Sequence, residues 1–179
     1  MTSHPHSEGP LARTGAARVE AWRNTEWQKL WLAMQARSWR SLAVVPAGPG
    51  APPDFTVIVA NTLARTGMSH LNAPFHVADA TRLPLAHLVS FAEELKNYTK
   101  EGEFVLVALA LSSVNPITIS LAQSADAALL CVLMEEMSSA DAKKTVKRIG
   151  AARFLGSAVF YPGDLPSGGS GFPPPEKGA

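Results

Sequence analysis

The sequence is poor in the features that mark secreted, zinc-binding and membrane-spanning proteins. Its one cysteine, Cys131, can form neither an internal disulfide bond nor the ligand set of a structural zinc site. No run of about 18 apolar residues, the length that a membrane-spanning helix needs, occurs in the sequence. The first residues also lack the apolar stretch of a signal peptide. We therefore expect a cytoplasmic protein without a membrane span, which reaches the inner membrane only peripherally, through a partner.

An excess of charge of either sign is also missing. Lys and Arg together number 16 and Asp and Glu 15, which leaves a net charge of +1. Binding to a nucleic-acid backbone requires a large basic excess or a basic patch, so we expect no nucleic-acid partner. The five histidines are dispersed and match no metal-binding spacing. We therefore expect no metal site.

The length and composition suit one folded domain with short tails. The chain has 179 residues, of which 46% are hydrophobic, enough for one packed core. Residues 1–16 and 163–179 are rich in Gly, Pro and Ser, and such segments bury too little apolar surface to offset their ordering entropy. We predict that both segments are flexible tails and that residues 17–162 form the domain.

Short apolar segments alternate with amphipathic segments along the predicted domain. The apolar segments are predicted to be strands at 41–46, 75–79, 104–111, 127–134 and 154–160. The amphipathic segments are predicted to be helices at 17–37, 55–66, 84–99 and from Ser138 or Ser139 to Gly150. This alternation predicts an α/β fold of three layers, a mostly parallel sheet of about five strands flanked by helices on both faces.

Several motifs occur in one order along the chain. They read VEAWRNTEWQKLWL at 19–32, SLAVVPAGPG at 41–50 and HVADATRLP at 76–84, followed by the segment 104–126 and by FLGSAVF at 154–160. With these motifs the chain resembles the cytoplasmic kinase domain of bacterial tyrosine kinases of capsule and exopolysaccharide synthesis, which are relatives of the MinD/ParA group of P-loop ATPases. The resemblance implies a P-loop NTPase-like fold, with a helix that ends in Ala125 and Asp126.

The first motif corresponds to a helix that packs subunits of that family into a ring. The family pattern is E-x-x-R-x-x-R, and here Glu26 stands in place of the last Arg. The tryptophans of this segment are either a core-facing stripe or part of a protein interface, where aromatic residues are enriched. The candidate interface residues are Glu20, Trp22, Arg23, Trp27 and Trp31.

The second motif corresponds to the start of a phosphate-binding loop, but the loop then departs from the family. Such a loop needs backbone N–H groups, a Lys for the β- and γ-phosphates and a Ser or Thr hydroxyl for Mg²⁺. Here no Lys or Arg lies between Arg40 and Arg65. Pro52 and Pro53 have no N–H to donate, and Asp54 adds a negative charge. The resemblance therefore implies a degenerate phosphate-binding loop.

The acidic residues that hold the metal in the family are also depleted. Ala108 stands where the family has an Asp after a buried strand, while Asp79 and Arg82 match the acidic motif at 76–84. Asp79 is either a remnant of the metal site or a residue that caps a turn. The degenerate site comprises Ala47, Gly48, Pro49, Gly50, Asp54, Thr56 and Asp79. We expect no catalytic residue and no cofactor, with weak binding of Mg²⁺ and ATP left open.

The resemblance and these losses together predict a catalytically inactive pseudokinase or pseudo-ATPase. Its role would be that of a regulatory or scaffolding subunit in exopolysaccharide or capsule biosynthesis and export. The resemblance implies as partner a membrane polysaccharide chain-length-determinant protein, a related kinase or a second copy of the chain. The alternatives are a divergent protein tyrosine kinase or ATPase of exopolysaccharide synthesis, and a MinD/ParA-like positioning factor. The family's tyrosine-rich tail has no counterpart here, because the sequence holds only Tyr98 and Tyr161.

Overall fold

The computed structural model describes residues 23–165, which form a parallel five-stranded sheet between two layers of helices. The strand order is β2-β3-β1-β4-β5, and all four neighbouring pairs are parallel. The predicted α/β class, with its parallel sheet and three layers, is confirmed. The strands are β1 (Ser41–Pro46), β2 (Phe75–Asp79), β3 (Phe104–Ala108), β4 (Ala127–Leu133) and β5 (Phe154–Phe160).

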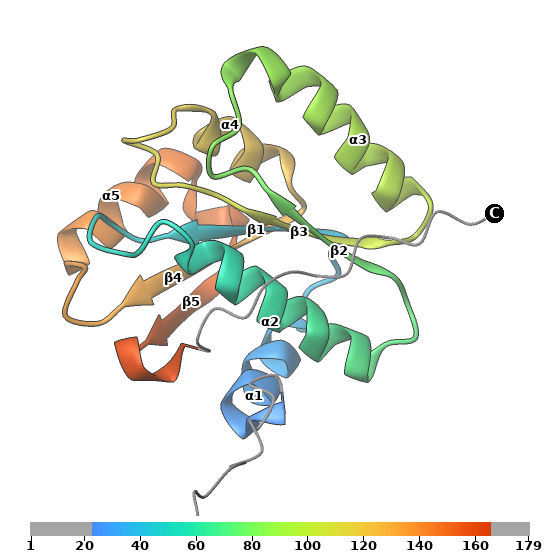
Figure 1. Ribbon diagram of the computed structural model, residues 1–179, viewed down its shortest axis with the longest axis horizontal. Helices are drawn as coiled ribbons and strands as arrows, with labels where there is room; N and C mark the ends of the chain where they lie inside the picture. The colour runs from blue at the N-terminus through green and yellow to red at the C-terminus, as the bar shows by residue number, and fades with distance from the viewer. Residues whose placement is uncertain (1–22, 166–179) are drawn as a thin grey trace, which may run out of the picture.

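Two helices cover one face of the sheet and three cover the other (Figure 1). The first layer is α1 (Thr25–Met34) and α2 (Phe55–His70), and the second is α3 (Leu88–Lys100), α4 (Ile117–Ser124) and α5 (Ser139–Ile149). Short 3₁₀ turns are η2 (Leu85–His87), η3 (Ala151–Arg153) and η4 (Pro162–Asp164). None of the helices between residues 23 and 165 combines the length and the apolar character that a membrane crossing requires.

The central strand β1 is buried on both faces, as a strand between two helical layers must be. Leu42 and Val44 belong to the core beneath α1 and α2, whereas Ala43 and Val45 belong to the core beneath α3, α4 and α5. Successive side chains of a strand point to opposite faces, so an uninterrupted apolar run serves both cores. The apolar run at 41–46 is therefore the central strand of the sheet, and it contributes side chains to both hydrophobic cores.

Gly67 does not end the second helix, contrary to the prediction of a helix over 55–66. The helix α2 continues to His70. A Cβ atom on Gly67 would lie 2.6 Å from ring atoms of both Phe75 and Trp31. Glycine at this position therefore allows the helix to pack closely against two aromatic rings, and it is a packing residue rather than a helix stop.

Other predicted boundaries shift by a few residues. The strand predicted at 104–111 ends at Ala108, and the strand predicted at 127–134 ends at Leu133. The helix predicted at 84–99 starts with the turn η2 before α3. The helix predicted at 17–37 appears as α1 from Thr25, while residues 17–22 lie outside the described part of the chain.

The amino ends of the strands are closed by a hydrogen-bonded cluster around Asp126. One carboxylate oxygen accepts from the backbone N–H groups of Arg40 and Ser41, both at 2.9 Å. The N–H of Asp126 donates in return to the Ser41 hydroxyl at 2.9 Å. Burial by itself raises the pKa of the Asp126 carboxyl, but the hydrogen bonds from Arg40 and Ser41 and the charge of Arg153 outweigh it, so the pKa is lowered. This cluster joins the start of β1 to the start of β4.

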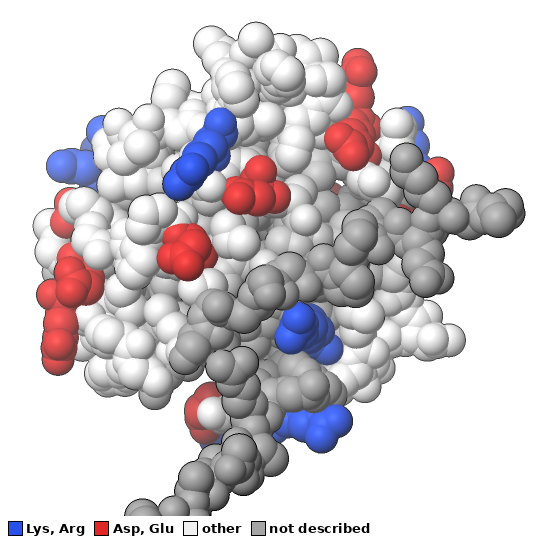
Figure 2. Space-filling view, viewed as in Figure 1, with Lys and Arg blue, Asp and Glu red and all other residues white. Residues whose placement is uncertain are grey.

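Charged side chains are scattered over the surface in view. In Figure 2 the Lys and Arg side chains and the Asp and Glu side chains are dispersed over the surface, and neither sign gathers into a broad patch. The basic residues of α5 are exposed, and two of them occupy its last turn, where they complement the helix dipole. These residues are Lys143, Lys144, Lys147 and Arg148.

Candidate functional site

A pocket of about 340 Å³ opens at the carboxyl ends of β1 and β3. These strands are neighbours, but the chain leaves β1 for α2 on one face and leaves β3 for α4 on the other. In parallel α/β sheets, ligands bind in the crevice at such a switch of direction. The pocket is lined by Pro46, Gly48, Pro49, Gly50, Ala51, Pro52, Pro53, Phe55, Thr56, Thr81, Arg82, Leu109, Ala110, Leu111 and Val114.

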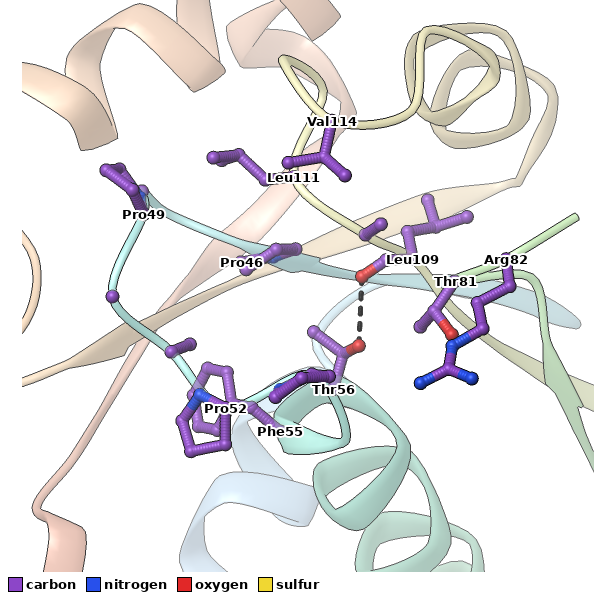
Figure 3. Close-up of a pocket in the computed structure, with 15 residues that line it drawn as sticks. Pro46, Pro49, Pro52, Phe55, Thr56, Thr81, Arg82, Leu109, Leu111 and Val114 are labelled. Atoms are coloured by element: carbon purple, nitrogen blue, oxygen red, sulfur yellow. Dashed lines mark hydrogen bonds between the residues drawn. The ribbon is translucent and has the colours of Figure 1, made fainter.

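Apolar side chains make up most of this lining (Figure 3). Leu111 and Val114 lie on the α4 side of the pocket, and Pro52 and Phe55 lie on the α2 side. Arg82, which follows β2, is the one lining residue with a charged side chain within the described chain. It is exposed to solvent, and no residue of 23–165 forms an ion pair or hydrogen bond with its side chain. The pocket is therefore an apolar cavity with a single cation at its edge.

The loop that follows β1 is fixed by contacts with β4 and α5. The N–H of Ala47 donates to the carbonyl of Cys131 at 2.8 Å, and the carbonyl of Ala47 accepts from the buried Thr145 hydroxyl at 2.9 Å. A Cβ atom on Gly48 would lie 2.7 Å from the Cβ of Asp141. The loop therefore rests against β4 and α5, and its first glycine is needed for that contact.

Gly50 is required for two reasons. Its φ is +102°, a conformation that side-chain-bearing residues rarely adopt, and a Cβ there would lie 2.5 Å from the carbonyl oxygen of Glu136. The glycines of the AGPG motif thus have a structural use that needs no phosphate. The segment 47–50 is explained as a packed strand-to-helix turn.

The electrostatics of the loop disfavour a ligand with several negative charges. The Asp141 carboxylate lies 3.5 Å from the position of a Cβ on Gly48. Asp54 precedes α2 and makes no capping hydrogen bond. No Lys or Arg of the loop balances these two carboxylates. A triphosphate in this loop would therefore meet negative charge on both sides.

Part of the backbone of the loop is still open. Within residues 23–165, the N–H groups of Gly48, Gly50, Ala51 and Asp54 have no hydrogen-bond partner. Successive unpaired N–H groups in such turns bind anions. The next two positions are prolines, so this row of donors is interrupted. The loop retains room for one anionic group but lacks the full set of donors that a phosphate chain uses.

Thr56 and Asp79 have structural partners. The Thr56 hydroxyl is buried and donates to the carbonyl of Leu109 at 2.9 Å, which joins α2 to the end of β3 (Figure 3). Asp79 accepts from the N–H of Thr81 at 2.9 Å and from its hydroxyl at 2.6 Å. This arrangement is an Asx turn. Asp79 therefore fixes the turn that brings Arg82 to the pocket.

The strand β3 ends at Ala108, whose side chain is only a methyl group. Ala108 pairs with Asp79 across the sheet and with Val44 on its other side. Within the described residues, no group of three or more His, Cys, Asp or Glu side chains is arranged to hold a metal ion. Burial raises the pKa of the Cys131 thiol, so this residue is held as a neutral core side chain.

The candidate interface residues separate into two groups. Glu20 and Trp22 lie outside the described residues, and Arg23 is exposed. The side chains of Trp27 and Trp31 are only 5% and 1% exposed. Their indole rings pack inward, for example with Trp27 against Phe160 at 5.4 Å between ring centroids, as a core-facing stripe does. The outward face of α1 instead offers Leu32, which is 60% exposed.

Several residues of the site were not found by sequence reasoning. Asp141 and Thr145 of α5, and Glu136 between β4 and α5, contact the loop. The bond between Thr145 and Ala47 joins residues that are 98 positions apart in the sequence. Only the serine cap of α5 was visible in that segment. Arg82 was noted as a match to a motif, but its place as the cation of the pocket depends on the turn after β2, which the tertiary structure sets.

Two of the solved structures that share this fold match the chain over most of its length. One is the chimerical protein CapA2B2, with a TM-score of 0.58 and 14% sequence identity over 79% of this chain and 84% of that chain. The other is the BceF tyrosine kinase domain, with a TM-score of 0.52 and 14% identity over 74% of this chain and 73% of that chain. At this identity the likeness shows the fold alone. The chain matches no protein-family model, and a search of curated proteins finds no match.

Proposed function

We propose that this chain is a catalytically inactive relative of bacterial tyrosine kinases that acts as a regulatory or scaffolding subunit in exopolysaccharide or capsule biosynthesis and export. The observation that carries the proposal is the composition of the loop after β1 in a fold like that of a kinase domain. Where a nucleotide would bind, this loop has no Lys but contains two prolines, and two carboxylates lie nearby. The fold shared with the BceF tyrosine kinase domain supports the family, and the sequence motifs support the polysaccharide role.

The energetic cost of these changes is large enough to abolish ordinary nucleotide binding. A hydrogen bond to a charged group contributes about 1.5–3 kcal/mol, and each 1.4 kcal/mol changes an affinity about tenfold. The loop lacks the lysine and the N–H groups of Pro52 and Pro53, and Ala108 replaces the metal-binding acid. Three such losses together weaken Mg²⁺-ATP binding by at least about a thousandfold.

The proposed partner is the cytoplasmic part of a membrane chain-length-determinant protein or an active kinase of the same family. The contact would use the outward face of α1 and the segment before it, with Glu20 and Arg23 as the residues that match the family's ring-forming pattern. Because Trp27 and Trp31 are buried in the core, the exposed Leu32 is the large apolar residue that this face offers.

Titration calorimetry with Mg²⁺-ATP tests the loss of catalysis. The native chain is expected to show no saturable binding below millimolar nucleotide, whereas an active kinase domain of the resembled family, measured in parallel, serves as the positive control. Micromolar binding that depends on Mg²⁺ would contradict the proposal. It would favour a divergent tyrosine kinase or ATPase, a function for which the unpaired N–H groups of Gly48, Gly50 and Ala51 are the structural support.

A second experiment tests the partner. The native chain is mixed with an active kinase domain of the family, and the complex is followed by size-exclusion chromatography together with the autophosphorylation rate of the kinase. The variant Leu32→Asp is expected to lose the complex, while Met68→Asp is the matched control, at an apolar residue on α2 that is 50% exposed. An unchanged rate and no complex with this kinase or with a chain-length-determinant protein would contradict the scaffolding role.

A further inference from the structure

We propose that the pocket between β1 and β3 binds a small apolar molecule that carries a single anionic group, with the Arg82 guanidinium as its charge partner. This inference rests on the loss of nucleoside triphosphate binding proposed above. It goes beyond that proposal because it assigns a different class of ligand to the cavity. A domain with only a structural role would not require an open cavity at this position.

The first support is the cavity itself. It encloses about 340 Å³, and proline, alanine, leucine and valine side chains form most of its walls. Small-molecule sites are typically concave and largely apolar, with a few polar groups that orient the ligand. Val114 stands at this pocket with 75% of its surface exposed, as a side chain that a ligand would cover. The walls therefore suit a ring system or a branched hydrocarbon of the size of two fused rings.

The second support is the position and the availability of Arg82. In Figure 3 its guanidinium lies on the side of the pocket where α2 begins, with Thr81 beside it. No described residue pairs with this guanidinium, so a ligand does not have to displace an existing carboxylate. The backbone before it is fixed by the Asx turn of Asp79. Arg is well suited to bind planar anions such as carboxylate, sulfonate or phosphate.

The third support limits the ligand to one negative charge. Asp141 packs against Gly48 on one side of the loop, and Asp54 lies at the start of α2. Another cation of this region, Arg148, donates to the Ser112 hydroxyl at 3.3 Å and does not line the pocket. Neither carboxylate lines the pocket, but Arg82 is the one charged side chain of the described lining, so a second or third negative charge on the ligand would have no cation to pair with. The unpaired N–H groups of the loop assist one anionic group but do not neutralise several.

A matched pair of fluorescent probes tests the proposal on the full chain. The probe 8-anilinonaphthalene-1-sulfonate has an apolar ring system and one sulfonate, and N-phenyl-1-naphthylamine is the same skeleton without the charge. Both fluoresce when they enter an apolar site. The native chain is expected to bind one molecule of the sulfonate probe per chain, and more tightly than the neutral probe, because only the sulfonate engages Arg82.

Three variants separate the charge from the cavity. Arg82→Gln is expected to lower the affinity for the sulfonate probe about tenfold, which corresponds to the loss of one charge-assisted hydrogen bond. The affinity for the neutral probe is expected to stay unchanged. Arg65→Gln removes the same charge from an exposed position on α2 and is expected to change neither. Val114→Asp places a carboxylate at the pocket and is expected to weaken the sulfonate probe more than tenfold.

The outcomes that overturn the proposal are specific. Equal affinity of the sulfonate probe for the native chain and Arg82→Gln would overturn it, as would an equal loss in Arg65→Gln or binding of several molecules per chain. Retained binding of the neutral probe by Arg82→Gln shows that this variant is folded. Loss of both probes with an unchanged circular dichroism spectrum would also overturn the role of Arg82 as charge partner.

Addition of Mg²⁺-ATP distinguishes this inference from the proposed function. If micromolar Mg²⁺-ATP displaces the sulfonate probe, the loss of nucleotide binding is wrong and this inference falls with it. If Mg²⁺-ATP leaves the probe in place but Arg82→Gln has no effect, only the ligand class proposed here fails. If Mg²⁺-ATP leaves the probe in place and Arg82→Gln weakens it, both proposals are supported.

Discussion

The two ends of the sheet differ in whether their polar groups have hydrogen-bond partners. At the amino ends of the strands, Asp126 accepts from two backbone N–H groups, and the Arg40 side chain donates to the carbonyl of Gly102 at 2.6 Å while it lies over the Phe104 ring. At the carboxyl ends, four loop N–H groups and Arg82 have no partner within the described chain, and an open cavity separates the loops. The polar groups around Asp126 and Arg40 are paired, whereas those around the cavity are not.

The difference indicates which end of the sheet has polar groups that a ligand could engage. Saturated polar groups stabilise a fold, because each buried donor or acceptor left unpaired costs about 1–3 kcal/mol. Unsaturated groups around a cavity are available to a ligand. The unpaired groups and the cavity lie where ligands bind in parallel α/β sheets, beyond the carboxyl ends of the strands, even though no Lys or Arg lies between Arg40 and Arg65.

The largest effect is expected for Gly50→Ala at the carboxyl end. A Cβ there meets the carbonyl of Glu136 at 2.5 Å and φ is +102°, so strain and crowding together lower the free energy of unfolding by about 3 kcal/mol. The matched control Gly102→Ala, at the amino end, has φ of +85° but no atom within 4 Å, and is expected to cost about 1 kcal/mol. Urea denaturation measures both. Equal costs would show that the loop is not tightly packed.

A smaller effect is expected for Thr56→Val. The variant removes the hydroxyl that donates to Leu109, whose carbonyl accepts no other hydrogen bond from residues 23–165, so we expect a loss of about 2 kcal/mol. Thr66→Val is the control, because the carbonyl of Thr62 that its hydroxyl contacts also accepts a bond within the helix α2. Thermal unfolding of both variants measures the difference. A cost for Thr66→Val as large as that for Thr56→Val would contradict this interpretation.

Asp126→Asn is expected to lower the free energy of unfolding by about 1 kcal/mol at neutral pH. Because the folded-state pKa of Asp126 is lowered, its contribution is fully present above the unfolded pKa of about 4 and is lost as the pH falls through the folded pKa. The native chain and the variant should therefore converge in stability at low pH. Denaturation measured from neutral pH down to about pH 2 checks this, and a constant difference would argue against an ionised Asp126.

The smallest effect on stability is expected for Arg82→Gln. The side chain is exposed and has no described partner, so its replacement should change the free energy of unfolding by less than about 0.5 kcal/mol. Together with the probe experiment, this result would show that Arg82, at the carboxyl ends of the strands, contributes to ligand binding and not to stability. Denaturation in urea measures it, and a loss above 1 kcal/mol would place Arg82 in the structural framework.

The fold followed from the sequence because its signals are local and repeated. The uncharged run at 104–111 and the run at 127–134 marked buried strands, and the amphipathic segments between strands marked helices. The predicted helix end before Gly67 was wrong, because a glycine that ends a helix and a glycine that lets a ring approach look alike in sequence. Only the position of Trp31 and Phe75 distinguishes them.

The candidate site could be predicted from the sequence less completely than the fold. The missing lysine and the two prolines can be read from the residues between Arg40 and Arg65. The contact of Asp141 with Gly48 and the place of Arg82 at the pocket depend on which elements the topology brings together. No spacing in the sequence encodes such long-range neighbours, so the charge around the pocket could be assessed only from the structure.

The hydrogen bond between Thr145 and Ala47 links the pocket mechanically to a distant surface. Thr145 is on α5, whose opposite side exposes Lys143, Lys144 and Lys147. Any occupant that shifts the loop after β1 must either break this buried bond or pull the helix with it. The Thr145 hydroxyl and the Ala47 carbonyl thus form a direct connection between the loop at the cavity and this basic helical surface.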